Sequence, residues 1–131
     1  MAPGAGRASG AAVSFRVEAA DGHARAGVLA TAHGEIRTPA FMPVGTKATV
    51  KSLHPDEVRA LGAQVVLGNA YHLHFRPGED VVEHLGGIHA FSGWSGPILT
   101  DSGGYQVFSL RDTIMSLGED GVSFRSVYDG S

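Results

Sequence analysis

Beyond the first third of the 131-residue chain, short apolar runs alternate with helical patterns, and this alternation constrains the fold more than any other feature. Residues 40–45, 63–69 and 97–100 are typical of short buried strands, and residues 52–62 and 79–87 are typical of helices. Strands separated by helices of this length pair in parallel through right-handed crossovers. The sequence therefore predicts an α/β fold made of successive strand-helix units.

The helix predicted at residues 52–62 carries its own boundary signals. Ser52 is the predicted cap, Pro55 falls near the first turn, and Gly62 is the predicted stop. Asp56 and Glu57 would lie at the positive end of the helix dipole.

Ahead of these units, residues 13–19 alternate apolar and polar side chains, and His33-Gly34 lies between two further apolar runs. Both patterns indicate strands joined by tight turns, so a small antiparallel sheet is expected before the main fold. Residues 121–127 alternate in the same way and predict another hairpin arm. Residues 1–12 are rich in Ala and Gly and are predicted to be disordered.

No G-x-G-x-x-G motif follows the first strand of the α/β part, which disfavours a dinucleotide-binding doubly wound sheet. The regular units favour a partial (β/α)8 barrel instead. A complete barrel needs roughly 200–250 residues, so we expect this chain to be the first part of a longer enzyme, with one domain over residues 13–131.

The composition excludes several classes. The chain has no cysteine and a formal charge of -3, so it has no disulfide, no thiolate metal site and no strongly basic surface for nucleic acid. It has no apolar run long enough to cross a membrane and no signal peptide, and a cytoplasmic location is expected. His72-x-His74 is open to two interpretations, a metal-binding pair or ordinary packing residues.

Three loops place polar groups just after predicted strands: 45–47, 68–69 and 101–106. In parallel α/β folds such loops converge at one edge, where active sites form. Asp101 follows an apolar strand directly and has two possible roles. It is either a turn or cap residue, or a partly desolvated carboxylate for proton transfer or for holding a sugar hydroxyl. Asn69 is either a turn residue or the group that orients Asp101.

The residues after Asp101 suit a planar ligand. Gly103 and Gly104 would let a ring approach closely, Tyr105 offers a flat stacking face, and Gln106 carries a bidentate amide that can read a base edge. Core packing and a capping bond are the alternatives for Tyr105 and Gln106.

Other side chains have weaker indications. Lys47 and Lys51 would contact phosphate or a partner carboxylate, or simply face solvent. Trp94 is expected to form a wall between units. The histidines expected to have structural roles are His54, His84 and His89.

Four segments stand in one order: "TPAFMPVGT", "LGAQVVLGNAYHLHFRPG", "LGGIHAFSGWSGPILTDSGGYQVFSL" and "EDGVSFRSVYDGS". Together they resemble the amino-terminal part of the tRNA-guanine transglycosylases. That resemblance implies an irregular (β/α)8 barrel with an antiparallel sheet at its amino end. It also implies exchange of guanine at the wobble position of tRNA for a 7-deazaguanine. Gly104 and Tyr105 resemble the bacterial form, which uses 7-aminomethyl-7-deazaguanine.

Carried over to this sequence, the resemblance implies that Asp101 is the proton acceptor and that Asn69 steadies it in the free site. The substrate-binding segment would comprise Asp101, Ser102, Gly103, Gly104 and Tyr105, with Tyr105 stacking on the exchanged base.

The remaining family features are expected downstream of Ser131. They include the nucleophilic aspartate, the tRNA-contacting segments and a zinc site with three cysteines and a histidine. We therefore expect the fragment to be inactive alone and the complete protein to be a homodimer. Two alternatives stay open: a non-catalytic tRNA-binding partner subunit of the same family, and a phosphate-binding barrel enzyme of unrelated chemistry.

Overall fold

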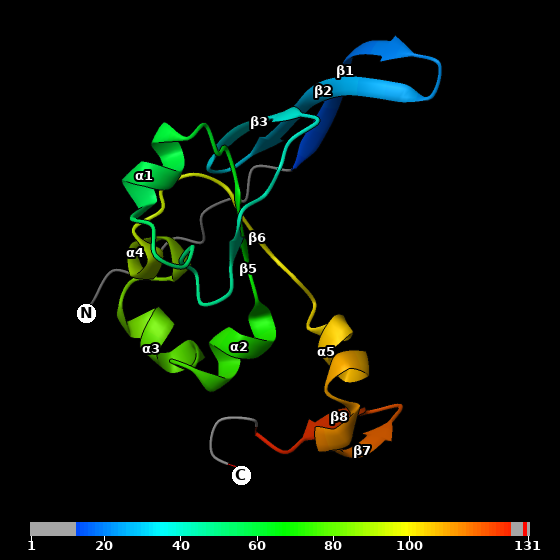
Figure 1. Ribbon diagram of the computed structural model, residues 1–131, viewed down its shortest axis with the longest axis vertical. Coiled ribbons are helices and arrows are strands. Elements are labelled where there is room, and N and C mark those ends of the chain that lie inside the picture. The colour runs from blue at the N-terminus through cyan, green and yellow to red at the C-terminus, as the bar shows by residue number, and fades with distance from the viewer. Residues whose placement is uncertain (1–12, 127–129, 131) are drawn as a thin grey trace, which may run out of the picture.

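The computed structural model describes residues 13–126 and residue 130 (Figure 1). The tail predicted to be disordered, residues 1–12, lies outside the described residues. The strands are β1 Ser14–Asp21, β2 Ala24–Thr31, β3 Gly34–Thr38, β4 Val44–Gly45, β5 Val66–Gly68, β6 Ile98–Thr100, β7 Ile114–Gly118 and β8 Gly121–Phe124. The helices are α1 Pro55–Ala60, α2 Ala70–Phe75, α3 Glu79–His84, α4 Ile88–Ser92, α5 Gly104–Ser109 and the 3-10 turn η1 Arg111–Thr113.

The amino-terminal strands form the predicted antiparallel sheet, in the order β1-β2-β3. His33 lies in its second turn and Gly34 is the first residue of β3, so the hairpin predicted around His33-Gly34 is present. Figure 1 shows β1 and β2 extending away from the rest of the molecule. The ring of Phe15 lies over Gly27 on β2. A Cβ built on Gly27 would lie 2.5 Å from the backbone oxygen of Arg16 and 2.8 Å from Cζ of Phe15. This sheet therefore requires glycine at position 27.

A second sheet contains β4, β5 and β6 as parallel neighbours in sequence order. This arrangement confirms the mixed α/β class and the parallel pairing predicted from the alternating pattern. Helices α1 to α4 lie in the connections between these strands (Figure 1). Closure of the sheet into a barrel stays a prediction. The third sheet is the β7-β8 hairpin, which confirms the arm predicted from residue 121 onwards.

The strand predicted at residues 40–45 is mostly wrong, because only Val44–Gly45 pairs with a neighbour. Pro39 and Pro43 lack the N–H that a central strand donates to its ladder. The side chain of Phe41 is 82% exposed instead of buried. The chain here approaches the sheet and joins it only at the last two positions.

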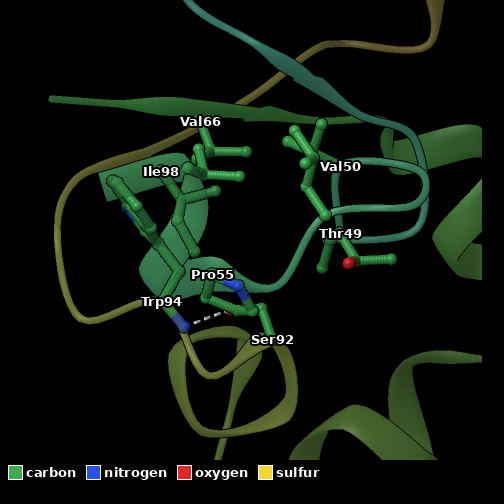
Figure 2. Close-up of a pocket in the computed structure, with 11 residues that line it drawn as sticks. Thr49, Val50, Pro55, Val66, Ser92, Trp94 and Ile98 are labelled. Carbon is green, nitrogen blue, oxygen red and sulfur yellow. Dashed lines mark hydrogen bonds between the residues drawn. The ribbon is translucent and has the colours of Figure 1, made fainter. Parts of the chain in front are cut away.

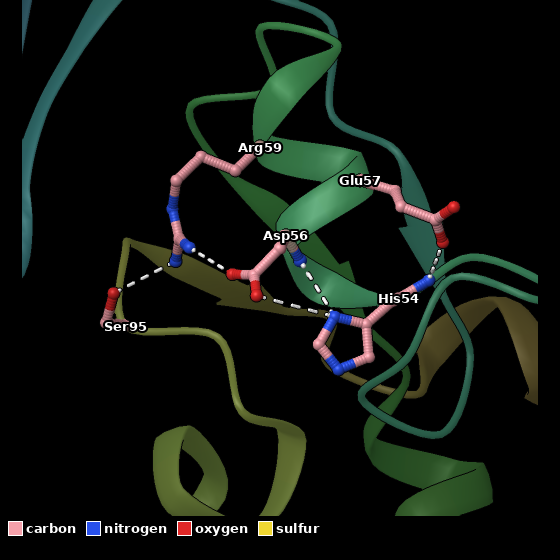
Figure 3. Close-up of polar contacts among 5 residues, drawn as sticks. All are labelled: His54, Asp56, Glu57, Arg59 and Ser95. Carbon is pink, nitrogen blue, oxygen red and sulfur yellow. Dashed lines mark hydrogen bonds and ion pairs between the residues drawn. The ribbon is translucent and has the colours of Figure 1, made fainter.

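The helix α1 begins later than predicted. Ser52 has a φ of 66°, in the left-handed region, and cannot adopt the extended backbone of a cap residue. His54 is the cap instead, and its Nδ1 accepts a hydrogen bond from the N–H of Asp56 at 3.4 Å (Figure 3). Glu57 completes a capping box, since its Oε2 accepts from the N–H of His54 at 2.6 Å.

Two helices were missed by the pattern reading. Helix α2 lies directly after β5, where no helix was predicted, and α4 follows the helix predicted at 79–87. That predicted helix is α3 and ends earlier, at His84. Gly86 and Gly87 have φ values of 91° and 93°, in the left-handed region, and they separate α3 from α4.

The core lies between the parallel sheet and helices α1 and α4, around Val58, Val66 and Trp94. Trp94 fills the predicted role of a wall and donates from its Nε1 to the carbonyl oxygen of Pro97 at 3.0 Å. Figure 2 shows an apolar void in this core, between Val50 and Ile98. Its volume of about 10 Å³ is at the limit for one water molecule. It is therefore a small packing gap and not a ligand site.

Helix α1 is tied to the segment before β6 by a polar cluster (Figure 3). Arg59 donates to Oδ1 of Asp56 at 2.9 Å and to Oγ of Ser95 at 3.0 Å. Its guanidinium also lies 5.0 Å from the ring centre of Trp94, within cation-π range. None of the described helices has the length and apolar character needed to span a membrane.

We expect Gly27→Ala to lower the free energy of unfolding by about 1–3 kcal/mol, because the added methyl overlaps the Arg16 backbone. Gly118→Ala is the matched control, since a Cβ there meets nothing within 4 Å. Urea denaturation of both variants measures the difference. Equal stability of the two variants would contradict the packing described for β1 and β2.

We also expect His54→Ala to cost about 1 kcal/mol of stability, because the α1 cap is lost. His54→Ser keeps an acceptor at the cap and should restore most of this loss. Thermal unfolding of the two variants, with the exposed turn residue His23→Ala as control, measures the effect. A serine variant no more stable than the alanine variant would refute the capping role.

Candidate functional site

The ends of the three parallel strands are aligned. Gly45 on β4 pairs with Gly68 on β5, and Gly68 pairs with Thr100 on β6. The pairing continues for one more residue, because the N–H of Asp101 donates to the carbonyl oxygen of Gly68 at 3.2 Å. The loops after the three strands therefore leave the sheet at one edge, as the sequence predicted.

Asn69 follows β5 directly and is the cap residue of α2. Its backbone is extended, and its Oδ1 accepts a hydrogen bond from the N–H of His72 at 3.0 Å. Because the carboxamide oxygen is used by the cap, the Nδ2 amino group must point away from the helix. The local sequence thus fixes the direction in which Asn69 can donate.

The carboxylate of Asp101 receives that donation. Nδ2 of Asn69 lies 2.6 Å from Oδ2 of Asp101, and the backbone N–H of Ala70 donates to Oδ1 at 2.7 Å. Both distances are short for N–H···O hydrogen bonds. Both carboxylate oxygens are therefore engaged by the junction between β5 and α2, and the contact predicted between Asn69 and Asp101 is present.

The backbone donor of Ala70 was not predicted. Its only sequence signal is the cap residue before it, because the first N–H groups of a helix lack partners within the helix. Once α2 is known to begin after Asn69, the N–H of Ala70 is free to bind an acceptor from β6. Helix α2, which was not predicted, thus supplies one of the two hydrogen bonds to the Asp101 carboxylate.

The segment after Asp101 turns sharply into α5. Gly103 has a φ of 72°, in the left-handed region, and Ser102 Oγ accepts from the N–H of Gly104 at 3.3 Å. A Cβ on Gly103 would also lie 3.9 Å from Cβ of Tyr71. Glycine at 103 is required by the turn itself.

Tyr105 and Gln106 behave differently. Tyr105 is 75% exposed, so its ring face is open, whereas Gln106 is buried and its Oε1 has no hydrogen-bond partner among the described residues. Tyr105 is thus placed where a planar ligand could stack on it. The burial of Gln106 agrees with the packing alternative for this residue.

A surface hollow adjoins this turn. It has a volume of about 540 Å³ and is bordered by α2, the 102–104 turn and β8. Its walls include the rings of Tyr71 and Phe75, whose centres are 4.9 Å apart. The turn after Asp101 therefore borders space that is large enough for a small aromatic molecule.

The histidines predicted as a possible metal pair lie on α2. Positions two apart on a helix point in different directions, and His74 Nδ1 lies 2.9 Å from Oε2 of Glu79. The pKa of Glu79 is lowered by its backbone hydrogen bond and then by His74. Within the described part of the chain, no group of three His, Asp or Glu side chains could hold a metal ion. The zinc implied by the family resemblance stays a prediction.

The two lysines predicted as phosphate contacts, Lys47 and Lys51, are both exposed on the segment between β4 and α1. Their role in this site stays a prediction.

Substitution of Asn69 separates its two functions. Asn69→Ser keeps an acceptor for the α2 cap but loses the donor to Asp101, which should cost about 1.5 kcal/mol of unfolding free energy. Asn69→Ala loses both and should cost more. Urea denaturation checks this order, and a serine variant as stable as the unaltered protein would contradict the assigned contact.

Asn69→Asp also keeps the cap, but it places two carboxylates together. Like charges raise the pKa of at least one of the pair in the folded state. The variant should therefore match the unaltered protein best in acid, and its deficit should grow as the pH rises above about 4. A deficit that stays constant between about pH 4 and pH 7 would contradict this.

Comparison with known proteins agrees with the sequence motifs. The family model described as queuine tRNA-ribosyltransferase matches residues 20–131. Three curated proteins named queuine tRNA-ribosyltransferase show the same likeness. The one from Oleidesulfovibrio alaskensis is 56% identical over 117 residues, which are 89% of this chain and 31% of that protein. The one from Cereibacter sphaeroides is 59% identical over 118 residues, 90% of this chain and 31% of that protein.

The third, from Jannaschia sp., is 58% identical over 120 residues, 92% of this chain and 32% of that protein. The chain thus spans about a third of the length of the curated relatives that it matches. The matched region includes both strands that carry the Asn69–Asp101 contact, and on this evidence the chain belongs to the queuine tRNA-ribosyltransferase family.

Proposed function

We propose that the intact protein is a tRNA-guanine transglycosylase that exchanges guanine at the wobble position for 7-aminomethyl-7-deazaguanine, in queuosine biosynthesis. The observation that carries the proposal is the carboxylate of Asp101, held at the edge of the parallel sheet by Asn69 and the α2 backbone. Membership of the family supports the reaction class.

The proposed role of Asp101 is proton transfer at the exchanged base. Displacement at the anomeric carbon of a ribose passes through an oxocarbenium-like transition state and calls for two carboxylates. One attacks the ribose carbon, and the other manages protons as one base leaves and the next enters. We assign Asp101 to the second role, and we expect the attacking aspartate from the part of the family sequence that follows the matched region.

The hydrogen bonds to Asp101 would position its carboxylate before a base binds. A carboxylate has about four acceptor positions, two on each oxygen, so these two hydrogen bonds leave room for a proton from a base. We propose that the Asn69 contact is exchanged when the base binds. Asn69 and Ala70 would hold the carboxylate in place while the site is empty. Tyr105, whose ring is exposed, would stack on the base, and the 102–104 turn would border it.

The partners follow from the same proposal. We propose tRNA, through its anticodon loop, and the 7-deazaguanine base as ligands, a homodimer as the assembled state, and the cytoplasm as location. The net charge of -3 indicates that tRNA affinity would depend on basic surface outside this chain.

Asp101→Asn in the intact protein should reduce base exchange by about 10²-fold to 10⁴-fold, because the proton acceptor is lost. Incorporation of labelled guanine into tRNA measures exchange, and a gel-shift assay measures tRNA binding, which should be unchanged. Asp120→Asn is the matched control, since Asp120 is an exposed turn residue between β7 and β8. Full exchange by Asp101→Asn would refute the assignment.

The double variant Asn69→Asp with Asp101→Asn is a sharper test. It exchanges the carboxylate and the amide across the same 2.6 Å contact, so the hydrogen bond and the α2 cap can both reform. Stability should recover toward that of the unaltered protein while exchange stays low. Recovery of exchange together with stability would reduce Asp101 to a structural residue.

The same assays address the rival function. A non-catalytic tRNA-binding subunit would bind tRNA without exchanging the base, even when unaltered. In that case Asp101→Asn and Asp120→Asn would behave alike in every assay.

A further inference from the structure

The amino-terminal sheet contacts the parallel part of the fold through a pair of stacked histidines. His33 lies in the turn between β2 and β3, and His89 lies on α4. Their ring centres are 3.6 Å apart, and the angle between the ring planes is 17°. The same turn reaches the start of β6, because a Cβ on Gly34 would lie 4.0 Å from Cδ of Pro97. This contact joins segments more than fifty residues apart in the chain.

His89 is poorly placed to carry a charge. Its Nε2 is buried and has no hydrogen-bond partner among the described residues. A second proton would have to sit on this nitrogen, away from water and without an acceptor. A protonated His33 ring stacked at 3.6 Å would add like-charge repulsion.

From the stacking and the buried nitrogen, we propose that His33 and His89 form a pH-sensitive clasp that holds the β2-β3 turn on α4 when His89 is neutral and releases it in acid.

The surroundings of the clasp agree with this. Desolvation lowers the pKa of His89, the charge of His33 lowers it further, and a hydrogen bond with the Gly96 backbone opposes the shift. Helix α4 and residues 93–97 carry no other titratable side chain. The charged or titratable groups on the adjoining elements β3, α1 and α3 are Glu35, Arg37, Asp56, Glu57, Arg59, Glu79, Asp80, Glu83 and His84. None of these is among the groups that shift the pKa of His89.

The sign follows from linkage. A histidine whose pKa is depressed in the docked state binds fewer protons there than in the released state, so docking is favoured as the pH rises. The contact is fully stable above about pH 6.5, the ordinary pKa of histidine, and weakens as the pH falls below it. Acid therefore releases the turn.

A second attachment gives an internal control that does not titrate. The carboxamide of Gln64 pairs with the backbone of Arg37 on β3: its Oε1 accepts from the Arg37 N–H at 2.9 Å, and its Nε2 donates to the Arg37 oxygen at 3.3 Å. The Gln64 side chain thus forms the same two hydrogen bonds with Arg37 that a neighbouring strand would form at this edge of β3. Its loss should loosen the sheet equally at every pH.

Hydrogen exchange of the intact protein, followed by mass spectrometry of residues 31–38, tests the clasp at about pH 7.5 and about pH 5. After correction for intrinsic rates, protection should fall roughly tenfold for each pH unit between the free and docked pKa values. His89→Phe keeps a flat ring without a buried titratable nitrogen and should abolish the pH dependence. Gln64→Ala should lower protection at both pH values while keeping the dependence.

Two results would overturn the proposal. One is that residues 31–38 of the unaltered protein are equally protected at both pH values, and the other is that His89→Phe loses protection in acid to the same extent as the unaltered protein. If His89→Phe docks at neither pH, the ring signals of His89 in the unaltered protein decide by nuclear magnetic resonance. His89 must then titrate over the same pH range in which residues 31–38 lose protection. Titration without loss of protection would refute the clasp.

Discussion

The candidate site depends on the pairing of Gly68 with its neighbours on both sides. Gly45, Gly68 and Thr100 lie in register across three parallel strands, so Asn69 and Asp101 leave the sheet side by side. A shift of one residue in either pair would turn one of these side chains to the opposite face. A Cβ at Gly68 would make ordinary van der Waals contact, at 3.7 Å, with side-chain atoms of Ile88, Leu73 and Thr100. The strand register is therefore the constraint on which the site depends.

Much of the site was accessible from the sequence, because short apolar runs followed by polar loop residues mark strand ends. The strands β5 and β6, the common edge of the loops and the partnership of Asn69 with Asp101 were predicted on that basis. The fold as a whole was less accessible. Residues 70–75 hold three rings of His or Tyr among apolar neighbours, and so short a helix has no clear periodicity. The second donor to Asp101 could not be predicted without that helix.

Local backbone geometry explains the other misses. Ser52 is a residue type that often caps helices, but its backbone is left-handed. His54 caps α1 instead, although histidine is not a common cap residue. Pro39 and Pro43 interrupt an apolar run that otherwise suits a strand. The stacking of His33 on His89 depends on tertiary structure alone, because neither residue has a neighbour in sequence that indicates a contact. It links the antiparallel sheet to the helix that precedes β6, the strand that carries Asp101.

The central claim is that Asp101 is held by Asn69 and α2 when the site is empty and is freed for proton transfer when a base is bound. Crystal structures of the intact protein with and without 7-aminomethyl-7-deazaguanine measure this directly, through the distance from Asn69 Nδ2 to Asp101 Oδ2. The account predicts a hydrogen bond near the present 2.6 Å in the free protein and a separation beyond hydrogen-bond range in the complex. An Asp101 that already points away from Asn69 in the free protein, or that keeps the contact unchanged with the base in place, would contradict it.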